Sequence, residues 1–351
     1  MSLDIKATIE GPTIKVSVSE FEDGCQFAFY VYRGAKRIHT QKYGASSKLD
    51  FDTNGTPGYY RVLAFVRRGS DPPLRMFSNP VFANPVCVTA SDLPEPGSDR
   101  MVYNIHGYQW TFPTLYYPGA RAHLFVLLSA AVNRNHVELP VFNRWTWAEQ
   151  SLFPGETLCI ADPTLSLHPN LRIGWYLGTR SSDLLDELAT IITKFAISRS
   201  IPRDNIIVWG SSAGGFAALS LATRIATSTA VAINSQTNPL SYEKKDQVEL
   251  MRRVCFDALS DEAIRQQHPL RIDARSFFTP DARSRAILVQ NKNDTHQHKD
   301  HFLPFWNSLG GAETDGWAQS SQHLAFVYEG PHAHVAESYI LAQQILTKSC
   351  R

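Results

Sequence analysis

The stretch from residue 206 to residue 218, IIVWGSSAGGFAA, combines an apolar run, the pattern G-x-S-x-G and a segment of small residues. A continuous apolar run is typical of a strand buried on both faces, and the small residues favour a closely packed helix. Gly210 and Gly214 allow the strand and the helix to approach each other, so the sharp turn between them raises the Ser212 hydroxyl above the sheet. The helix N-terminus then offers N–H groups to an oxyanion. Ser212 is therefore the candidate nucleophile.

Apolar runs of the same kind occur before and after this stretch. They lie at residues 124–128, 158–161, 230–233 and 286–289. Segments with apolar residues at helical spacing separate them, as at residues 184–195. This alternation predicts an α/β fold in which helices cover both faces of a mostly parallel sheet.

The segment at residues 206–218 resembles the nucleophile elbow of the α/β-hydrolase superfamily, and the resemblance covers about residues 101–351. It implies the chain order serine, acid, histidine, with each residue in a loop after a later strand. Asp294 follows the apolar strand at residues 286–290, where this order places the acid. Asp300 is the second candidate.

Two histidines compete for the role of the base after the last predicted strand. His332 and His334 lie in the same loop. We favour His334, because the superfamily's histidine lies just before the final helix, which we expect to begin near Val335. In this arrangement His334 takes the proton of Ser212 while Asp294 orients the imidazole.

The oxyanion hole is expected to consist of backbone N–H groups. The first donor is Ala213, next to the nucleophile. The second should come from the loop after the strand at residues 124–128, where Ala130 and Ala131 are the candidates. The superfamily's common His-Gly turn is missing there, but a backbone donor needs no particular side chain.

Residues 296–301, HQHKDH, resemble the zinc-binding signature of the metallo-β-lactamase superfamily. His296, His298 and Asp300 have types and spacing that can chelate a divalent ion. In that superfamily the signature comes early in the chain, whereas only 50 residues follow His301 here. A metal-dependent hydrolase stays an alternative, and the plainer interpretation is a polar loop above the active site with a helix that starts at His301.

Aromatic residues follow several of the predicted strands. Trp145, Trp175 and Tyr176 are candidate substrate contacts, because indole and phenol faces stack on sugars and other flat groups. Ser211, beside the nucleophile, is a fourth candidate. Packing at the base of the loops is the alternative role of the aromatic residues.

The first 84 residues have a different pattern. Apolar and polar residues alternate in short runs separated by glycine and proline turns, which predicts a small antiparallel β-sandwich. Residues 58–62, GYYRV, resemble the F-strand of immunoglobulin-like and fibronectin-like modules. Residues 84–100 have the composition of a linker. The sequence thus predicts a sandwich at residues 1–84 and a hydrolase domain at residues 85–351.

The two-part layout also resembles hydrolase-fold proteins found beside bacterial surface-glycan genes. This resemblance depends on the layout and on the segments at residues 133–134, 175–176 and 301–305. It implies a carbohydrate ester, or an acyl-transfer substrate.

Composition excludes several other classes of protein. The net charge of +1 provides no field that would attract nucleic acid or an anionic membrane. No apolar run reaches the length of a membrane span. The N-terminus lacks the basic start and the apolar core of a signal peptide. Residues 1–3 resemble a cloning remnant, so a trimmed leader stays an open alternative. The five cysteines are scattered, which favours reduced thiols in the cytoplasm.

These patterns together predict a serine esterase that acts on a small-molecule or glycan ester through an acyl-enzyme on Ser212. Acyl transfer to another acceptor is an open alternative, and so are the metal-dependent hydrolase and a non-catalytic glycan-binding or scaffold protein. The serine mechanism requires no cofactor. The sequence leaves the oligomeric state undetermined.

Overall fold

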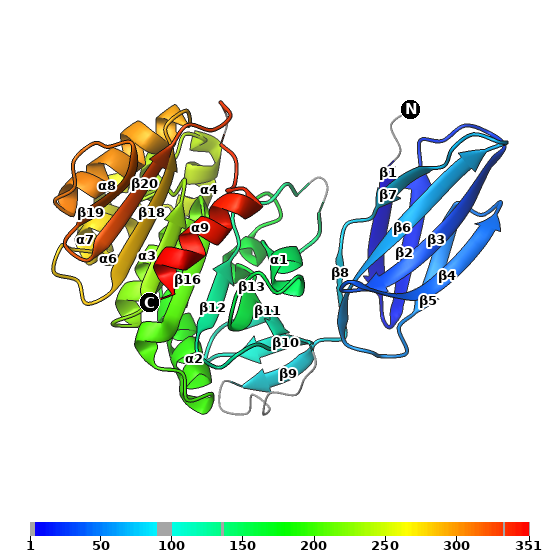
Figure 1. Cartoon of the computed structure of the whole chain (residues 1–351), viewed down its shortest axis with the longest axis horizontal. Coiled ribbons are helices and arrows are strands. Elements are labelled where there is room, and N and C mark those ends of the chain that lie inside the picture. The colour runs from blue at the N-terminus through cyan, green and yellow to red at the C-terminus, as the bar shows by residue number, and fades with distance from the viewer. Residues whose placement is uncertain (1–3, 90–99, 135–136, 333, 351) are drawn as a thin grey trace.

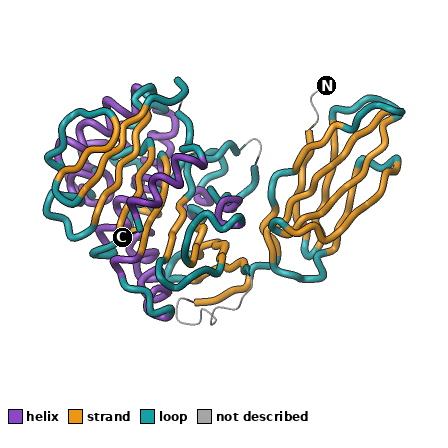
Figure 2. The backbone as a smooth tube through the Cα atoms, in the orientation of Figure 1, coloured by secondary structure: helices purple, strands orange, loops and turns teal. Residues whose placement is uncertain are grey.

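The computed structural model describes residues 4–89, 100–134, 137–332 and 334–350. Figures 1 and 2 show a strand-rich N-terminal part beside a larger part, in which helices flank a long twisted sheet. The backbone of the larger part brings together the loops that carry the candidate catalytic residues.

The N-terminal part consists of two antiparallel sheets with a shared apolar core. Alternate residues of the strand at residues 13–19 face this core, namely Ile14, Val16 and Val18. The strands are β1 (Asp4–Glu10), β2 (Thr13–Ser19) and β5 (Lys48–Asp52) in one sheet, and β4 (Lys36–Gly44), β3 (Cys25–Arg33), β6 (Gly58–Arg68), β7 (Leu74–Phe77) and β8 (Val81–Ala83) in the other.

The large sheet has ten strands among the described residues; six consecutive strands of it are parallel, and five of these include the predicted apolar runs. The strand order is β19 (Gly316–Ser320), β20 (His323–Tyr328), β18 (Arg285–Asn291), β17 (Thr229–Ile233), β16 (Ile206–Ser211), β12 (Leu124–Leu128), β13 (Glu156–Ile160), β11 (Thr111–Tyr117), β10 (Met101–His106) and β9 (Val86–Thr89).

Both faces of this sheet are buried, as the continuous apolar runs predict. Val126 and Val208 point into the core on one side, under α2 (Leu184–Ser198) and α3 (Ala213–Arg224). Phe125 and Trp209 point to the other side, under α9 (Tyr339–Ser349). The prediction of an α/β fold is therefore confirmed. None of the helices in the described ranges is long and apolar enough to cross a membrane.

Shorter elements fill the connections between the strands. The helices are α1 (Trp145–Glu149), α4 (Lys245–Cys255), α5 (Asp261–Gln267), α6 (Pro269–Ile272), α7 (Ala274–Phe277) and α8 (Leu303–Ser308). The short 3₁₀ helices are η1 (Pro163–Leu167), η2 (Arg203–Asn205) and η3 (Pro239–Ser241), and η4 (Gln297–Phe302) is a short π-helix. The strand β14 (Gly178–Thr179) pairs with β15 (Ser182–Asp183).

The predicted linker at residues 84–100 is partly wrong. Val86 and Val88 of β9 alternate with polar neighbours, pack against the core of the large sheet and pair with β10. The segment therefore includes an edge strand of the large sheet, and its two valines, at period two, lie on the face that packs against the core. The rest of the predicted linker, residues 90–99, lies outside the described residues.

Candidate active site

The backbone at Ser212 has the strained geometry that the turn from β16 to α3 requires. Its φ of 55° and ψ of −122° are disfavoured for a residue with a side chain. A Cβ at Gly210 would lie 2.0 Å from the Gly214 carbonyl oxygen, and a Cβ at Gly214 would lie 2.8 Å from the Ser129 carbonyl oxygen. Glycine is therefore needed at both positions for the strand, the helix and the neighbouring loop to meet around Ser212.

The Ser212 hydroxyl contacts a residue that the sequence did not reveal. Its Oγ lies 3.2 Å from Oε1 and 3.0 Å from Nε2 of Gln236, which is fully buried in the loop after β17. Trp175 Nε1 donates to the same Oε1 over 3.3 Å. One signal in the sequence could have indicated Gln236. It is a polar residue three positions after a buried parallel strand, at the carboxyl ends of the strands, where Ser212 also lies.

Asp294 and His334 are joined across the loops that follow β18 and β20. The distance from Asp294 Oδ2 to His334 Nδ1 is 2.5 Å, and the side chains are 9% and 40% exposed. His332 is exposed and makes no hydrogen bond to Asp294. The structure therefore brings His334, rather than His332, to Asp294.

Both Ser212 and His334 belong to the described residues, and no hydrogen bond joins them in this structure. The Ser212 hydroxyl is hydrogen-bonded to Gln236 instead. Hydrogen bonds between catalytic groups are often long in unliganded enzymes and tighten when substrate binds, so this separation does not exclude His334 as the base.

A buried ion pair fixes the loop that carries His334. Arg144 Nε and Nη2 each donate to a different oxygen of Glu337 over 2.6 Å, and Trp209 Nε1 donates to Glu337 Oε1 over 2.8 Å. Burial alone would raise the pKa of Glu337, but Arg144 and the Trp209 indole hold it below its ordinary value. Glu337 follows His334 by three residues and Trp209 precedes Ser212 by three, so this network links the two loops.

The loop after β12 lies against the elbow. The Ser129 N–H donates to the Tyr176 hydroxyl over 2.7 Å, and that hydroxyl donates to the Ile160 carbonyl oxygen over 2.6 Å. Within the described part of the chain, the backbone N–H groups of Ala130, Ala131 and Ala213 make no hydrogen bond.

The candidate substrate residues are only partly brought together. Trp145 packs edge-on against Tyr59, with ring centroids 5.0 Å apart, so its ring covers the N-terminal part, and its role as a substrate contact stays a prediction. Trp175 and Tyr176 are fully buried and reach the site through Gln236 and Ser129. Ser211 is the last residue of β16 and is buried next to Ser212.

Two histidines of the HQHKDH run, His296 and His301, lie together near Asp294, with ring centroids 5.2 Å apart. His296 Nδ1 lies 2.7 Å from Asp300 Oδ2, and His301 Nδ1 accepts from the Thr237 N–H over 3.1 Å. Burial, followed by the repulsion of His296, lowers the pKa of His301 to about 4, so this imidazole is neutral at pH 7.

Among the residues that the structure describes, no group of three or more histidine, cysteine or acidic side chains is placed to hold a metal ion. The zinc interpretation of the HQHKDH run therefore gains no support from the fold. Asp300, the second candidate for the acid, pairs with His296 and not with His334.

Comparison with a solved structure supports an α/β-hydrolase-like fold. No protein-family profile and no curated protein sequence matches the chain. The capsule O-acetyltransferase of Neisseria meningitidis serogroup A is 14% identical, with a TM-score of 0.51 over 74% of this chain and 97% of that one.

Two further solved structures have lower TM-scores. The Gap123 glycosylation-associated protein complex from Streptococcus agalactiae is 14% identical, with a TM-score of 0.47 over 99% of this chain and 62% of that one. The acetyl xylan esterase from Paenibacillus sp. R4 is 12% identical, with a TM-score of 0.45 over 71% of this chain and 81% of that one.

Proposed function

We propose that this protein is a serine-dependent acyl hydrolase or acyltransferase that acts on an ester through a covalent acyl-enzyme on Ser212. The observation that carries the proposal is the strained elbow serine at the sheet edge that also bears the Asp294–His334 pair, with its 2.5 Å hydrogen bond. A nucleophile, a base and an orienting acid are the three groups that this chemistry requires.

In the proposed mechanism His334 Nε2 accepts the Ser212 proton while Oγ bonds to the ester carbonyl carbon. The N–H groups of Ala213 and of Ala130 or Ala131 bind the resulting oxyanion. The C–O bond to the leaving alcohol then breaks, and His334 returns its proton to that alcohol. Water or another hydroxyl attacks the acyl-enzyme by the same steps in reverse, and Asp294 stabilises the charged imidazole throughout.

We propose an ester of a small molecule or a glycan as the substrate. A capsule O-acetyltransferase is among the solved structures of similar fold, which supports an acyl group on a carbohydrate oxygen. Both hydrolysis and acyl transfer proceed through the same acyl-enzyme and differ only in the acceptor that resolves it.

Ser212 is expected to react covalently with a fluorophosphonate probe at neutral pH, because an adjacent base activates its hydroxyl. Mass spectrometry of the labelled protein should locate the adduct on Ser212, and the Ser212→Ala variant should remain unlabelled. Labelling should persist in EDTA, since the serine mechanism needs no metal ion. An adduct elsewhere, or labelling that EDTA abolishes and zinc restores, contradicts the proposal.

We also propose that residues 1–84 form a separate sandwich domain and residues 85–351 the catalytic domain. Tyr59 packs edge-on against Phe142 and Trp145 of the large part, at centroid distances of 5.3 and 5.0 Å, and Arg61 lies 5.2 Å from the Trp145 ring. The N-terminal part therefore covers apolar surface of the larger part without contributing a candidate catalytic residue.

A chain that begins at residue 85 is expected to retain fluorophosphonate labelling of its serine but to be less soluble and less stable, because Phe142 and Trp145 become exposed. Loss of the Tyr59 contact alone should lower the free energy of unfolding by about 1.5–3 kcal/mol, because the apolar surface that this side chain buries becomes exposed. Labelling and thermal denaturation of the full and shortened chains measure both effects. A shortened chain that folds but is not labelled would show that the N-terminal part completes the active site.

A further inference from the structure

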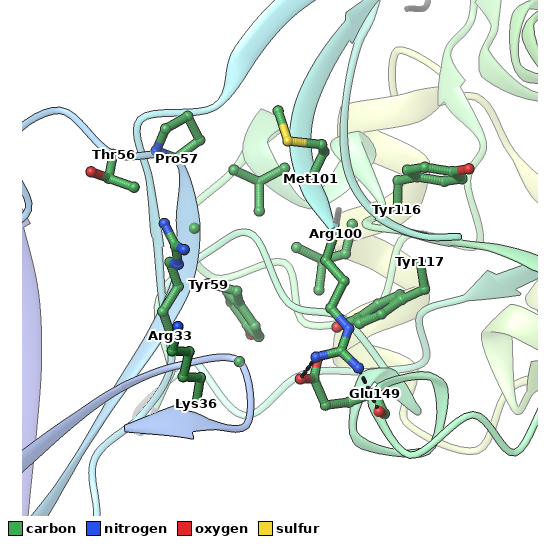
Figure 3. A pocket seen from close by; sticks show the side chains of 14 residues that line it. Arg33, Lys36, Thr56, Pro57, Tyr59, Arg100, Met101, Tyr116, Tyr117 and Glu149 are labelled. Atoms are coloured by element: carbon green, nitrogen blue, oxygen red, sulfur yellow. Dashed lines mark hydrogen bonds and ion pairs between the residues drawn. The ribbon is translucent and has the colours of Figure 1, made fainter. Parts of the chain in front are cut away.

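A cavity of about 390 Å³ lies between the N-terminal sheets and the large sheet (Figure 3). The turn between β3 and β4 and the loop before β6 form one wall. The start of β10, the end of β11 and the end of α1 form the other. Its volume is within the usual range of small-molecule sites.

This cavity is remote from Ser212. Tyr117, which lines it, pairs with Thr157, and the same register continues through Phe125 to Ile207 of β16. Ser212 lies five residues further along the chain, roughly 16 Å along the strand direction at about 3.3 Å per residue. The cavity and Ser212 therefore lie at opposite ends of the parallel strands.

The charges around the cavity are unbalanced. Arg33, Lys36 and Arg100 line it, and Glu149 is the one acidic residue among the described residues of the lining. The negative charge of Glu149 already has partners, because its carboxylate pairs with Arg100 and accepts a hydrogen bond from the Ala35 N–H over 2.8 Å. Arg33 and Lys36 form no ion pair with any residue in the described ranges, so the cavity has excess positive charge.

Two buried tyrosines add neutral hydrogen-bond donors, one in each wall (Figure 3). Tyr59 and Tyr117 are 7% and 6% exposed, and neither hydroxyl makes a hydrogen bond to another described residue. Burial raises the pKa of both phenols above the ordinary value, so both hydroxyls keep their protons at neutral pH. Arg100 lies over the Tyr117 ring, 5.9 Å from its centroid.

We propose that this cavity binds an anionic ligand, a small molecule that carries a carboxylate or phosphate group. Arg33 and Lys36 pair with its charge, and the Tyr59 and Tyr117 hydroxyls donate to its oxygens. Charge-assisted hydrogen bonds of this kind are the strong ones, and the apolar side chains of Met101 and Leu115 contact the remainder of the ligand. The ligand thus contacts both parts of the chain, at a site distinct from the ester site.

Calorimetric titration of the full chain tests this site with three probes: glucose 1-phosphate, glucuronate and neutral glucose. We expect at least one of the two anions to bind and glucose not to bind. The double substitution Arg33→Ala with Lys36→Ala should weaken anion binding at least about tenfold, and Tyr117→Phe should weaken it less. Arg37→Ala is the matched control, because Arg37 lies in the same hairpin but over the Tyr30 ring, outside the cavity.

Binding of one anion and not the other identifies the ligand as a phosphate or a carboxylate. If neither anion gives a heat of binding at about 10 mM, the proposal is overturned. It is also overturned if the double variant and the Arg37→Ala control bind the anion with equal affinity. Melting curves verify that each variant is folded. Fluorophosphonate labelling of Ser212 should be the same in all variants, so a failure of this proposal is distinguishable from a failure of the esterase proposal.

Discussion

Replacing His334, the base of the proposed mechanism, with alanine is expected to lower ester turnover by at least about a thousandfold, as removal of a triad member does. The reason is geometric, because His334 is the histidine of its loop that Asp294 holds, with Nδ1 2.5 Å from Oδ2. The other ring nitrogen is then left to take the Ser212 proton. Steady-state kinetics with a p-nitrophenyl ester measures the effect.

His332→Ala is the matched control for this measurement. His332 lies in the same loop but is exposed and unbonded to Asp294, so its removal should have a much smaller effect on turnover. Circular dichroism of both variants separates catalysis from folding. The reverse ranking would assign the base to His332 and leave the role of Ser212 unchanged.

Removing the Glu337 carboxylate is expected to lower the free energy of unfolding by about 3–5 kcal/mol, because Arg144 then remains buried without its partner. The two side chains are 0% and 5% exposed. Urea denaturation of Glu337→Ala measures this loss. Glu249→Ala is the control, since its pair with Arg252 is exposed and should contribute less than about 1 kcal/mol. Equal losses in the two variants would contradict the prediction.

A second variant separates stability from the position of the His334 loop. Replacing both partners, Arg144→Met with Glu337→Leu, leaves no unpaired charge and should regain most of the lost stability. Turnover should stay reduced, because Trp209 Nε1 loses its acceptor and the loop loses its link to β16. If turnover returns together with stability, the ion pair stabilises the fold and does not position His334.

The sequence predicts the strands of the large sheet because a strand buried on both faces needs apolar residues at every position. It also locates the elbow, since Gly210 and Gly214 are needed wherever backbones approach so closely. The juxtaposition of Asp294 and His334 follows from strand order, because parallel strands bring their carboxyl ends to one edge.

Other features depend on contacts that no local pattern encodes. Arg144 and Glu337 are 193 residues apart and meet only in the folded chain. The orientation of Trp145 depends on Tyr59 of the N-terminal part, so its spacing within the loop could not indicate which surface it covers. The short strand β9 was hidden in a segment of linker composition because two valines give too weak a periodic signal.

The contact between Gln236 and Ser212 has a consequence for the timing of the reaction. A hydroxyl carries one hydrogen atom, and in this structure both groups of the Gln236 amide lie within hydrogen-bond distance of the Ser212 oxygen. In the proposed mechanism, transfer of that hydrogen to His334 must be preceded by an exchange of partners. In that mechanism Ser212 reacts only after the Gln236 amide has found another partner, and the carbonyl or hydroxyl of an arriving substrate is such a partner.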